Sequence, residues 1–292
     1  MQGGMIISVA EVAVSIRSSE PIERIRLDPT DADFVSTGEP ALTVEAHYDG
    51  LPQVLLRAED QVFDSGTVWS LYRVDGRNVF VLRTPPSNPQ PYRIAIFDAG
   101  YRQGTVYSQA PAGQLSPDGL LSNPLEYPLS AVLMVCLLAQ ERGIMVHACG
   151  IDDGGRGYLF AGNSTHGKST TARLWKGRGT VLNDDRIVLR ERDGRFWMYG
   201  TPWHGDYDSV SPAGVPLEKI FFLNHDTTNN ATPRSGVVAA SKLLARAFPP
   251  LWDEPGMAYT LGLLDRLVTA VPCFDLGFVP GAEAVDFVRC VT

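Results

Sequence analysis

Apolar and polar residues alternate over short runs in the N-terminal part of the chain, which is typical of β-strands. Residues 67–73 and 78–83 are two such runs, and the Asp75-Gly76 pair between them favours the two-residue turn of a β-hairpin. Residues 92–97 alternate in the same way and predict another strand. We therefore expect a β-rich N-terminal domain.

The periodicity becomes helical after the segment 110–128, which is rich in proline, glycine and serine. Apolar residues recur at helical spacing from residue 129 to residue 140. Pro128 suits the first turn of this helix, and Gly143 suits the position just past its end. Because nearly every position is apolar, we expect the helix to be buried. The preceding segment marks a domain boundary, so the predicted domains are residues 1–125 and residues 126–292.

Strand-like and helix-like segments alternate in the second domain, which predicts an α/β fold with a mixed sheet. The turn residues Asp153-Gly154-Gly155 separate two strand-like runs, residues 144–151 and 157–161, which we expect to pair. The other predicted strands are residues 180–184, 187–192, 195–199, 217–223 and 273–278, and the predicted helices are residues 168–175, 237–248 and 256–269.

The chemistry of the chain is concentrated in the run Gly162-Asn163-Ser164-Thr165-His166-Gly167-Lys168-Ser169, which matches the phosphate-binding pattern GxxxxGK[ST]. A strand-like run precedes it and helix-forming residues follow it, which is the setting that this pattern requires. Glycine lets the backbone curl so that successive N–H groups point at phosphate oxygens, and the start of the helix adds its positive end to the same anion. The alternative is a glycine-rich turn that binds nothing.

The pattern predicts a binding site for ATP, or for GTP, together with Mg²⁺. Lys168 should reach the β- and γ-phosphates, and the Ser169 hydroxyl should ligate Mg²⁺. His166 occupies a variable position of the pattern, and we expect it to face solvent beside the phosphates. The predicted nucleotide-binding residues are Gly162, Asn163, Ser164, Thr165, His166, Gly167, Lys168, Ser169 and Thr170.

Two adjacent carboxylates, Asp184 and Asp185, end the predicted strand 180–184. The two aspartates could be solvated turn residues before a hairpin. Alternatively, they could form a site in which a cation lies between the two carboxylate groups. The residues between Lys168 and Asp184 can form only a short helix and a strand that returns along the sheet, so the two acids should lie beside the loop. One carboxylate can then hold Mg²⁺ while the other takes the proton of an incoming hydroxyl group. We assign Asp184 as the base and Asp185 as the metal-side partner, although the spacing does not determine their order.

His147 lies on the predicted strand 144–151, which should pair with the strand that enters the loop. It would then lie within reach of the two acids and would orient or tune one of them. A histidine in an apolar strand can also be a hydrogen-bonded core residue with no such role.

Residues 200–206, Gly-Thr-Pro-Trp-His-Gly-Asp, follow the hairpin that leaves the acidic pair. The simplest interpretation is a turn. As a functional segment, it would place Trp203 or His204 in the acceptor site and Asp206 in the metal site.

Composition excludes several other classes of protein. The chain has 292 residues, of which 44% are apolar, so it can bury a full core and is not disordered. Its net charge of −8 argues against binding nucleic acid over a whole surface. The longest apolar run, residues 131–139, is too short to span a bilayer, and the first residues lack the pattern of a secretory signal. We expect a cytoplasmic protein without a membrane or nucleic-acid partner, with buried, reduced thiols at Cys136, Cys149, Cys273 and Cys290.

In this order and spacing, His147, the loop at residues 162–170 and Asp184-Asp185 resemble the catalytic domain of bacterial HPr kinase/phosphorylase. More distantly they resemble ATP-dependent phosphoenolpyruvate carboxykinase. The resemblance covers about residues 127–289. It implies that the β-rich domain is followed in the chain by the P-loop catalytic fold of these enzymes. It further implies an active site that contains His147, Lys168, Ser169 and both acids, which serve as a metal-associated group and as a general base toward a seryl hydroxyl. Because the HPr enzymes are hexamers, it also implies a possible homo-oligomer.

The chain departs from the HPr enzymes after the acidic pair. It has no counterpart of their Glu-x-Arg-Gly-[Ile/Leu]-Gly segment, and residues 200–206 stand in its place. The sequence therefore predicts an ATP- and Mg²⁺-dependent kinase whose acceptor is a hydroxyl group, in the first instance a serine of a peptide or protein other than HPr. Two alternatives stay open: a kinase of a small metabolite, and a non-catalytic nucleotide-binding sensor or scaffold.

Overall fold

The computed structural model describes residues 4–84, 90–109, 119–163 and 165–292. The chain divides into two compact units, Met1–Val132 and Leu133–Thr292. The division along the chain falls inside helix α2 (Leu129–Leu138). The sequence analysis places the boundary in the segment before this helix, of which residues 110–118 lie outside the described part. Among the described residues, no helix combines the length and the hydropathy needed to cross a membrane.

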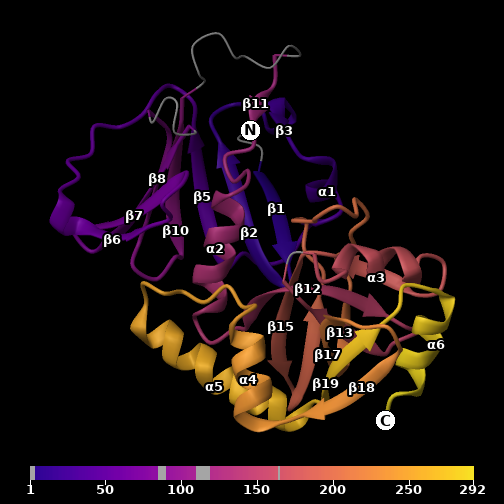
Figure 1. Ribbon diagram of the computed structural model, residues 1–292. Coiled ribbons are helices and arrows are strands. Elements are labelled where there is room, and N and C mark those ends of the chain that lie inside the picture. Colours follow the sequence, from indigo (N-terminus) through magenta and orange to yellow (C-terminus); the bar gives the residue numbers. More distant parts are fainter. Residues whose placement is uncertain (1–3, 85–89, 110–118, 164) are drawn as a thin grey trace. The chain divides into compact units, whose positions relative to one another are not determined.

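The first unit is built on a nine-stranded mixed sheet in the order β4-β1-β2-β5-β10-β9-β8-β7-β6 (Figure 1). Neighbouring strands are antiparallel except that β5 runs parallel to both β2 and β10. The strands are β1 (Gly4–Val9), β2 (Val12–Ser18), β4 (Val35–Ser36), β5 (Leu42–His47), β6 (Gln61–Asp64), β7 (Trp69–Val74), β8 (Arg77–Arg83), β9 (Pro91–Phe97) and β10 (Gln103–Ser108). A separate parallel pair joins β3 (Ile25–Arg26) to β11 (Leu121–Ser122), and a short helix, α1 (Pro29–Ala32), lies between β3 and β4 in the chain.

The predicted hairpin of the first unit is formed by β7 and β8. Asp75 and Gly76 both have positive φ, 49° and 72°, which is the conformation of a two-residue turn that matches the twist of its strands. The predicted strand 92–97 is β9. These local expectations, and the β-rich character of this part of the chain, are confirmed.

One face of this sheet is covered over only part of its width. Val79 and Val81 of β8 and Ile94 of β9 form a buried cluster against the segment that contains Leu51, Val54 and Leu56. Farther along the same face, on β5 and β10, exposed or half-buried residues replace these apolar ones.

The second unit is a mixed α/β unit with an eight-stranded sheet. Its strands are β12 (Ile144–Asp152), β13 (Gly157–Ala161), β14 (Thr180–Asn183), β15 (Arg186–Arg192), β16 (Arg195–Tyr199), β17 (Gly214–His225), β18 (Asn230–Arg234) and β19 (Cys273–Phe278). β12 and β17 are long strands that change partners along their length: β12 pairs first with β15 and then with β13 and β14, and β17 pairs first with β16 and then with β13 and β19. Because β13, β17 and β19 are parallel, their carboxyl ends meet at one edge, where α/β proteins bind ligands.

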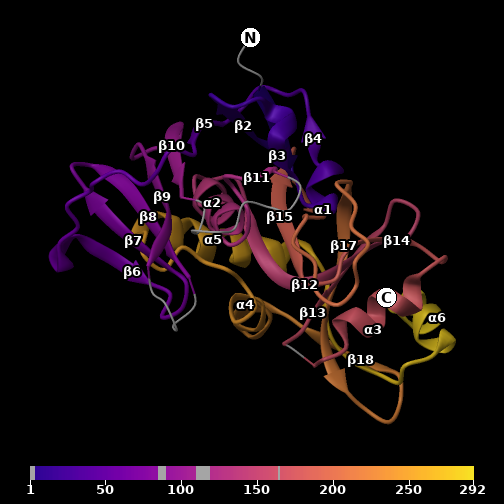
Figure 2. The ribbon, with the colours of Figure 1, turned by 90° about the horizontal axis from the view of Figure 1, so that it is seen from above.

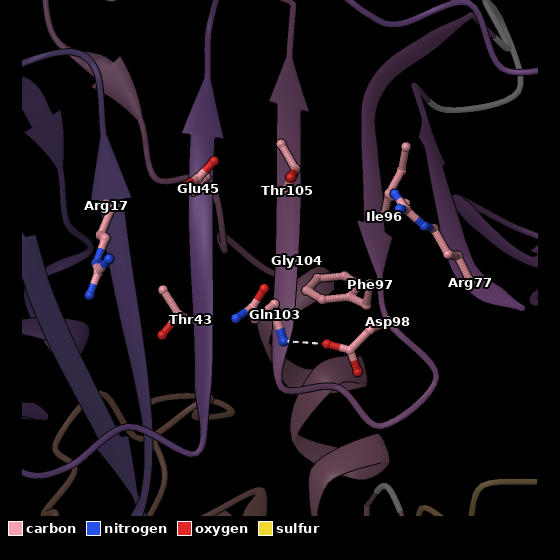
Figure 3. Close-up of a pocket in the computed structure, with 10 residues that line it drawn as sticks. All are labelled: Arg17, Thr43, Glu45, Arg77, Ile96, Phe97, Asp98, Gln103, Gly104 and Thr105. Carbon is pink, nitrogen blue, oxygen red and sulfur yellow. Dashed lines mark hydrogen bonds between the residues drawn. The ribbon is translucent and has the colours of Figure 1, made fainter.

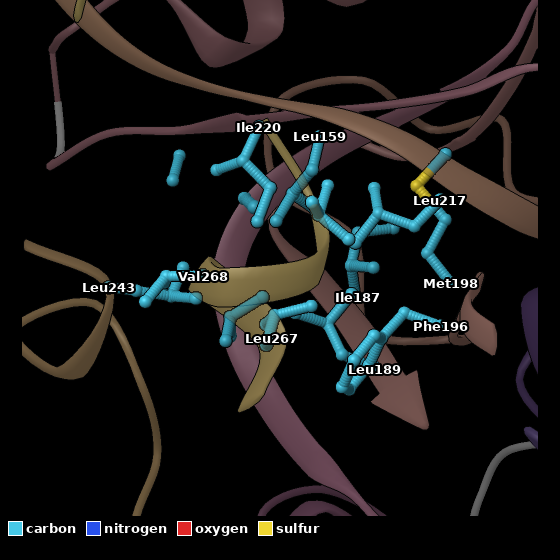
Figure 4. Packing of buried hydrophobic residues seen from close by; sticks show 14 of the residues in the cluster. Leu159, Ile187, Leu189, Phe196, Met198, Leu217, Ile220, Leu243, Leu267 and Val268 are labelled. Carbon is cyan, nitrogen blue, oxygen red and sulfur yellow. The ribbon is translucent and has the colours of Figure 1, made fainter. Parts of the chain in front are cut away.

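Helices cover both faces of the layer formed by β13, β17 and β19. Helices α3 (Lys168–Trp175) and α6 (Ala282–Cys290) lie side by side in both views and pack on the aromatic face that contains Phe160 and Phe221 (Figures 1 and 2). Helices α4 (Gly236–Leu244) and α5 (Glu254–Ala270) pack with β15 and β16 over the opposite face, where Leu159, Ile187 and Leu267 meet (Figure 4). This face holds the larger core of the unit.

The second unit corrects the sequence analysis at four places. The helix predicted over residues 237–248 ends at Leu244, because the chain after it forms a bridge with β12 through Val146 and Ala247. Strand β18 and helix α6 were not predicted. Cys290 is exposed at the end of α6 and so contradicts the expectation of four buried thiols, whereas Cys136, Cys149 and Cys273 are buried.

Asp153 anchors helix α6 and makes the stability of this unit depend on pH. Its buried carboxylate accepts hydrogen bonds from Arg289 Nη2 at 2.7 Å, Arg289 Nε at 3.0 Å and Arg156 Nη2 at 2.6 Å. The hydrogen bond from Arg289, together with the charges of Arg289 and Arg156, outweighs burial and holds the pKa of Asp153 below its usual range. A lowered pKa stabilises the fold above the unfolded value of about 4, and this contribution is lost as the pH falls through the folded value.

We therefore expect Asp153→Asn to lower the stability by about 1–3 kcal/mol at pH 7 and by less near pH 3, because the contribution of the lowered pKa shrinks once the pH falls below the unfolded value. Thermal unfolding of both proteins at the two pH values measures this. Asp265→Asn, on the exposed side of α5, is the matched control and should be neutral at both. An equal loss from Asp153→Asn at pH 7 and at pH 3 would contradict the assignment.

Candidate functional site

The loop between β13 and α3 is shaped by its two glycines. A Cβ at Gly162 would lie 3.0 Å from the Cβ of His166 and 3.3 Å from that of Leu223. Gly167, immediately before α3, has φ +93°, and a Cβ there would lie 3.0 Å from the Phe278 ring. The loop is therefore compact at both ends, with Thr165 also at positive φ (73°). Ser164 lies outside the described residues.

Lys168 places its amine inside this loop. The residue is 7% exposed, and its Nζ donates a hydrogen bond to the carbonyl oxygen of Asn163 at 3.1 Å. Burial lowers the pKa of the amine, and the negative charges of Asp185 and Asp184 only partly offset this. The amine is thus held against the loop backbone, with two carboxylates close enough to act on its charge.

Asp184 is the more deeply buried of the two acids, at 1% exposure. Its Oδ2 accepts hydrogen bonds from the Ser169 hydroxyl at 2.6 Å and from the Tyr207 N–H at 3.1 Å, and its Oδ1 accepts one from the Gly205 N–H at 2.7 Å. These three donors fix the carboxylate in one orientation against the first turn of α3. Asp184 and Ser169 therefore place two oxygen atoms in contact at the base of the loop.

Asp185 is half-buried and turns toward different partners. His147 Nε2 lies 2.9 Å from its Oδ1, and Arg186 Nη1 lies 3.1 Å from its Oδ2. Burial raises the pKa of this carboxyl, but the hydrogen bond from His147 and the charges of Arg186, His147 and Lys168 together outweigh it, so that the net pKa is below the usual range. The side chain is consequently an ionised acceptor that remains 22% exposed.

Asn183 and Thr201 hold the turn that carries both acids, and the sequence analysis assigned them no role. Both are fully buried. Asn183 Oδ1 accepts the N–H groups of Asp185 at 2.6 Å and Arg186 at 2.9 Å, while its Nδ2 donates to the Thr201 carbonyl at 2.8 Å. The Thr201 hydroxyl in turn donates to the Arg186 carbonyl at 2.8 Å. An asparagine before two aspartates was the available signal, because asparagine side chains often cap such turns.

A second set of residues missed from the sequence follows α4. The N–H of His147 donates to the Arg246 carbonyl at 2.6 Å, and the N–H of Phe248 donates to the Met145 carbonyl at 2.9 Å, so residues 246–248 run beside β12. The Phe248 ring lies 6.3 Å from the His147 ring and 5.4 Å from the Arg186 guanidinium. The helical periodicity of this segment concealed its extended end.

Arg246 brings a further positive charge to the site. Burial lowers the pKa of its guanidinium, and its charge in turn lowers the pKa of Lys168, so the two cations are near neighbours. Arg246 Nη1 donates to the Lys242 carbonyl at 2.7 Å, whereas Nε is buried with no hydrogen-bond partner. A buried donor without a partner is costly, and an anionic ligand would satisfy it.

The other predicted site residues are placed as follows. Asn163 and Thr165 are exposed, and Thr170 is half-buried on α3. His166 does not face solvent as expected: it is half-buried, its Nδ1 is buried, and its ring lies edge-on 5.9 Å from His225, which bonds the Thr165 carbonyl at 3.0 Å. The turn of the loop, with Thr165 at positive φ, brings the two imidazoles together.

Residues 200–206 contact the site through their backbone. The N–H groups of Gly205 and Tyr207 bind Asp184, whereas Trp203 is buried and Asp206 is exposed. The Nδ1 of His204 lies 2.9 Å from the Gly205 carbonyl. A role for the Trp203 or His204 side chain in an acceptor site, and for Asp206 in a metal site, stays a prediction.

Gly200 leaves no room for a side chain beside the acidic turn. A Cβ there would lie 2.0 Å from the Ser211 carbonyl oxygen and 2.6 Å from that of Leu182, and both are backbone atoms. Gly200→Ala should therefore destabilise the protein by about 1–3 kcal/mol or more, and it should displace the turn that holds Asp184. Gly38→Ala, where no atom lies within 4 Å of the added carbon, is the control. Thermal unfolding of both variants measures the effect, and equal midpoints would contradict it.

Comparison with known proteins finds distant structural similarity. No family model matches the chain, and no curated protein is similar to it in sequence. Among solved structures, the Hpr(Ser) kinase/phosphatase from Coxiella burnetii is similar over 50% of this chain and 93% of that chain, with a TM-score of 0.33 and 13% sequence identity.

Proposed function

We propose that the second unit binds ATP or GTP at residues 162–170 and transfers the γ-phosphoryl group to a hydroxyl group, in the first instance a serine of a peptide or protein. The observation that carries this proposal is the 2.6 Å hydrogen bond between the Ser169 hydroxyl and the buried Asp184 carboxylate. It joins the loop motif to the acidic pair. A glycine-rich turn without a ligand has no need of a buried lysine and a buried acid at the same helix start.

The loop and its neighbours are suited to hold a phosphate chain. The N–H groups at the start of α3 and the Lys168 amine supply positive charge within the loop, and the half-buried Arg246 adds a guanidinium whose Nε is buried and unsatisfied. Binding of the phosphates would give each of these donors an acceptor. Such preorganised positive charge is the main source of catalysis in phosphoryl transfer.

The Ser169 hydroxyl and the Asp184 carboxylate are the groups that would hold Mg²⁺, because both are hard oxygen ligands and they lie in contact. When bound, Mg²⁺ would supply positive charge to the β- and γ-phosphate oxygens. This proposal reverses the order suggested by the sequence, since Asp184 rather than Asp185 contacts the loop serine.

Asp185 is then the proton acceptor. His147 and Arg186 orient its two oxygens, and its lowered pKa keeps it ionised at neutral pH. As the acceptor oxygen forms its bond to the γ-phosphorus and the bond to the leaving nucleoside diphosphate breaks, the hydroxyl proton passes to Asp185. Phe248 and Arg186 border this carboxylate and would contact the acceptor.

Two measurements on the full chain test the proposal. Calorimetric titration with ATP, GTP and Mg²⁺ should show nucleotide binding that Lys168→Met weakens strongly and that Lys176→Met, at an exposed lysine just after the same helix, leaves unchanged. Incubation with γ-labelled ATP and either serine-containing peptides or small hydroxylated metabolites then distinguishes the two kinase alternatives. Binding without transfer to any acceptor would favour the sensor, and absence of nucleotide binding would refute all three.

A further inference from the structure

The first unit contains a cavity of about 310 Å³ on the open part of its nine-stranded sheet (Figure 3). Its lining comes from adjacent strands and includes Arg17 of β2, Thr43 and Glu45 of β5, Ile96 of β9, and Gln103 and Thr105 of β10. The volume lies at the lower end of the range for small-molecule sites. The kinase proposal assigns nothing to this region.

The polar side chains of the cavity are aligned by strand register. Glu45 is in register with Arg17 on one side and with Thr105 on the other. Two residues earlier on the same face, Thr43 is in register with Gln103. Adjacent strands lie about 4.8 Å apart, so these groups form two short rows at that spacing. The spacing is comparable to that of hydroxyl groups across a sugar ring.

Three of these side chains form no hydrogen bond within the described part of the protein. Within the described residues, no hydrogen bond or ion pair engages the side chains of Arg17, Glu45 or Thr105. Asp98, by contrast, uses its carboxylate to accept the N–H groups of Gly100 and Gln103 in the β9–β10 turn, which the dashed line in Figure 3 marks in part. The rows therefore offer donors and acceptors to a ligand.

The charge of the lining is balanced. The lining contains two arginines, Arg17 and Arg77, and two acids, Glu45 and Asp98. A phosphate or nucleic-acid site would carry an excess of positive charge. The balance favours a neutral ligand that both donates and accepts hydrogen bonds.

Aromatic side chains continue the same face. His47 and Tyr107 are paired in register two residues beyond Glu45 and Thr105, and their rings are stacked with centroids 5.2 Å apart. Aromatic rings beside hydroxyl, amide and carboxylate groups match a ligand whose C–H faces are apolar and whose edges carry hydroxyl groups. We propose that this face of the first unit, over β2, β5 and β10, binds a neutral saccharide.

The test uses the full chain, without nucleotide, so that its outcome is independent of the proposed kinase activity. Glucose, galactose, mannose, maltose and lactose are titrated by ligand-observed NMR and calorimetry, with inorganic phosphate and a serine-containing peptide as the competing ligand classes. We expect at least one of the neutral sugars to bind. Glu45→Gln and Thr105→Val should each weaken that binding about tenfold or more, because each removes a hydrogen-bonding partner of the sugar.

Glu39→Gln, at an exposed glutamate outside the cavity, and Lys168→Met in the second unit are the controls and should leave sugar affinity unchanged. Thermal unfolding shows that each variant is folded. The proposal is overturned if none of the five sugars binds, if the Glu45 and Thr105 variants bind sugar as the wild type does, or if these two variants instead abolish binding of phosphate or of the peptide.

Discussion

Replacing Asp185 with asparagine should lower kcat for phosphoryl transfer about 10²–10⁴-fold while the Kd for the nucleotide changes only a few-fold. Asp185 does not contact the loop serine, and its oxygens point to His147 and Arg186. The substitution keeps the shape of the side chain but removes its capacity to accept a proton. Single-turnover rates with γ-labelled ATP and calorimetric titration of the same preparations measure the two quantities separately.

The pH profile supplies a second readout of the same residue. Because the pKa of Asp185 is lowered, wild-type activity should be level through the neutral range and should decline only when acid pH protonates this carboxyl. Asp208→Asn, at an exposed acid in the same unit, is the matched control and should keep both kcat and the profile. If Asp185→Asn retained wild-type kcat while Asp184→Asn lost it without a change in nucleotide affinity, the order assigned from the sequence would be restored.

The local features of the site could be predicted because they depend on short-range chemistry. Strand 157–161 and helix 168–175 have the predicted bounds, since the residues between them require a sharp turn that only Gly162 and Gly167 allow. The sequence analysis expected His147 near the acids from the pairing of β12 with β13, but its contact with Asp185 comes from β15, where His147 is in register with Arg186. The bounds of the strand and the helix are thus set by neighbouring residues, whereas this contact is set by strand pairing across the sheet.

Features that depend on tertiary contacts could not be predicted in this way. The segment with Arg246 and Phe248 has a helical pattern of apolar residues, but the helix ends at Leu244 and Ala247 forms a bridge to β12 instead. The turn between β1 and β2 places Ala10 and Glu11 at positive φ, 50° and 61°, without the glycine or asparagine that would announce it. Strand β18 contains Pro233 and has no buried residue, so it lacks the alternation of a half-buried strand.

The order of the two acids shows a further limit of sequence patterns. Asp184 and Asp185 are adjacent and chemically identical, so their roles depend on which way each side chain turns. Asn183 and Thr201 decide this by fixing the turn, and Thr201 lies far along the chain, after the β15–β16 hairpin. Spacing from Lys168 places the pair beside the loop but carries no information on rotation.

Replacing Asp184 with asparagine should affect nucleotide binding and catalysis together. The carboxylate accepts hydrogen bonds at both oxygens, from Gly205 at Oδ1 and from Ser169 and Tyr207 at Oδ2. An asparagine amide must turn its NH₂ group toward one of these donors, which leaves a buried donor unsatisfied at about 1–3 kcal/mol. It also removes the negative charge that, with the Ser169 hydroxyl, would hold Mg²⁺. We therefore expect kcat/KM to fall about 10²–10³-fold.

The metal dependence distinguishes this effect from a general loss of structure. In the wild type Mg²⁺ should tighten nucleotide binding, whereas in Asp184→Asn the affinities with and without Mg²⁺ should converge and more Mg²⁺ should be needed for half-maximal rate. Asp208→Asn, at an exposed acid in the same loop, is the matched control and should keep the wild-type metal dependence. An Asp184→Asn protein that binds Mg²⁺ and nucleotide as tightly as the wild type, yet loses turnover, would assign the proton transfer to Asp184. The contact between Ser169 and Asp184 would then have no part in holding the metal.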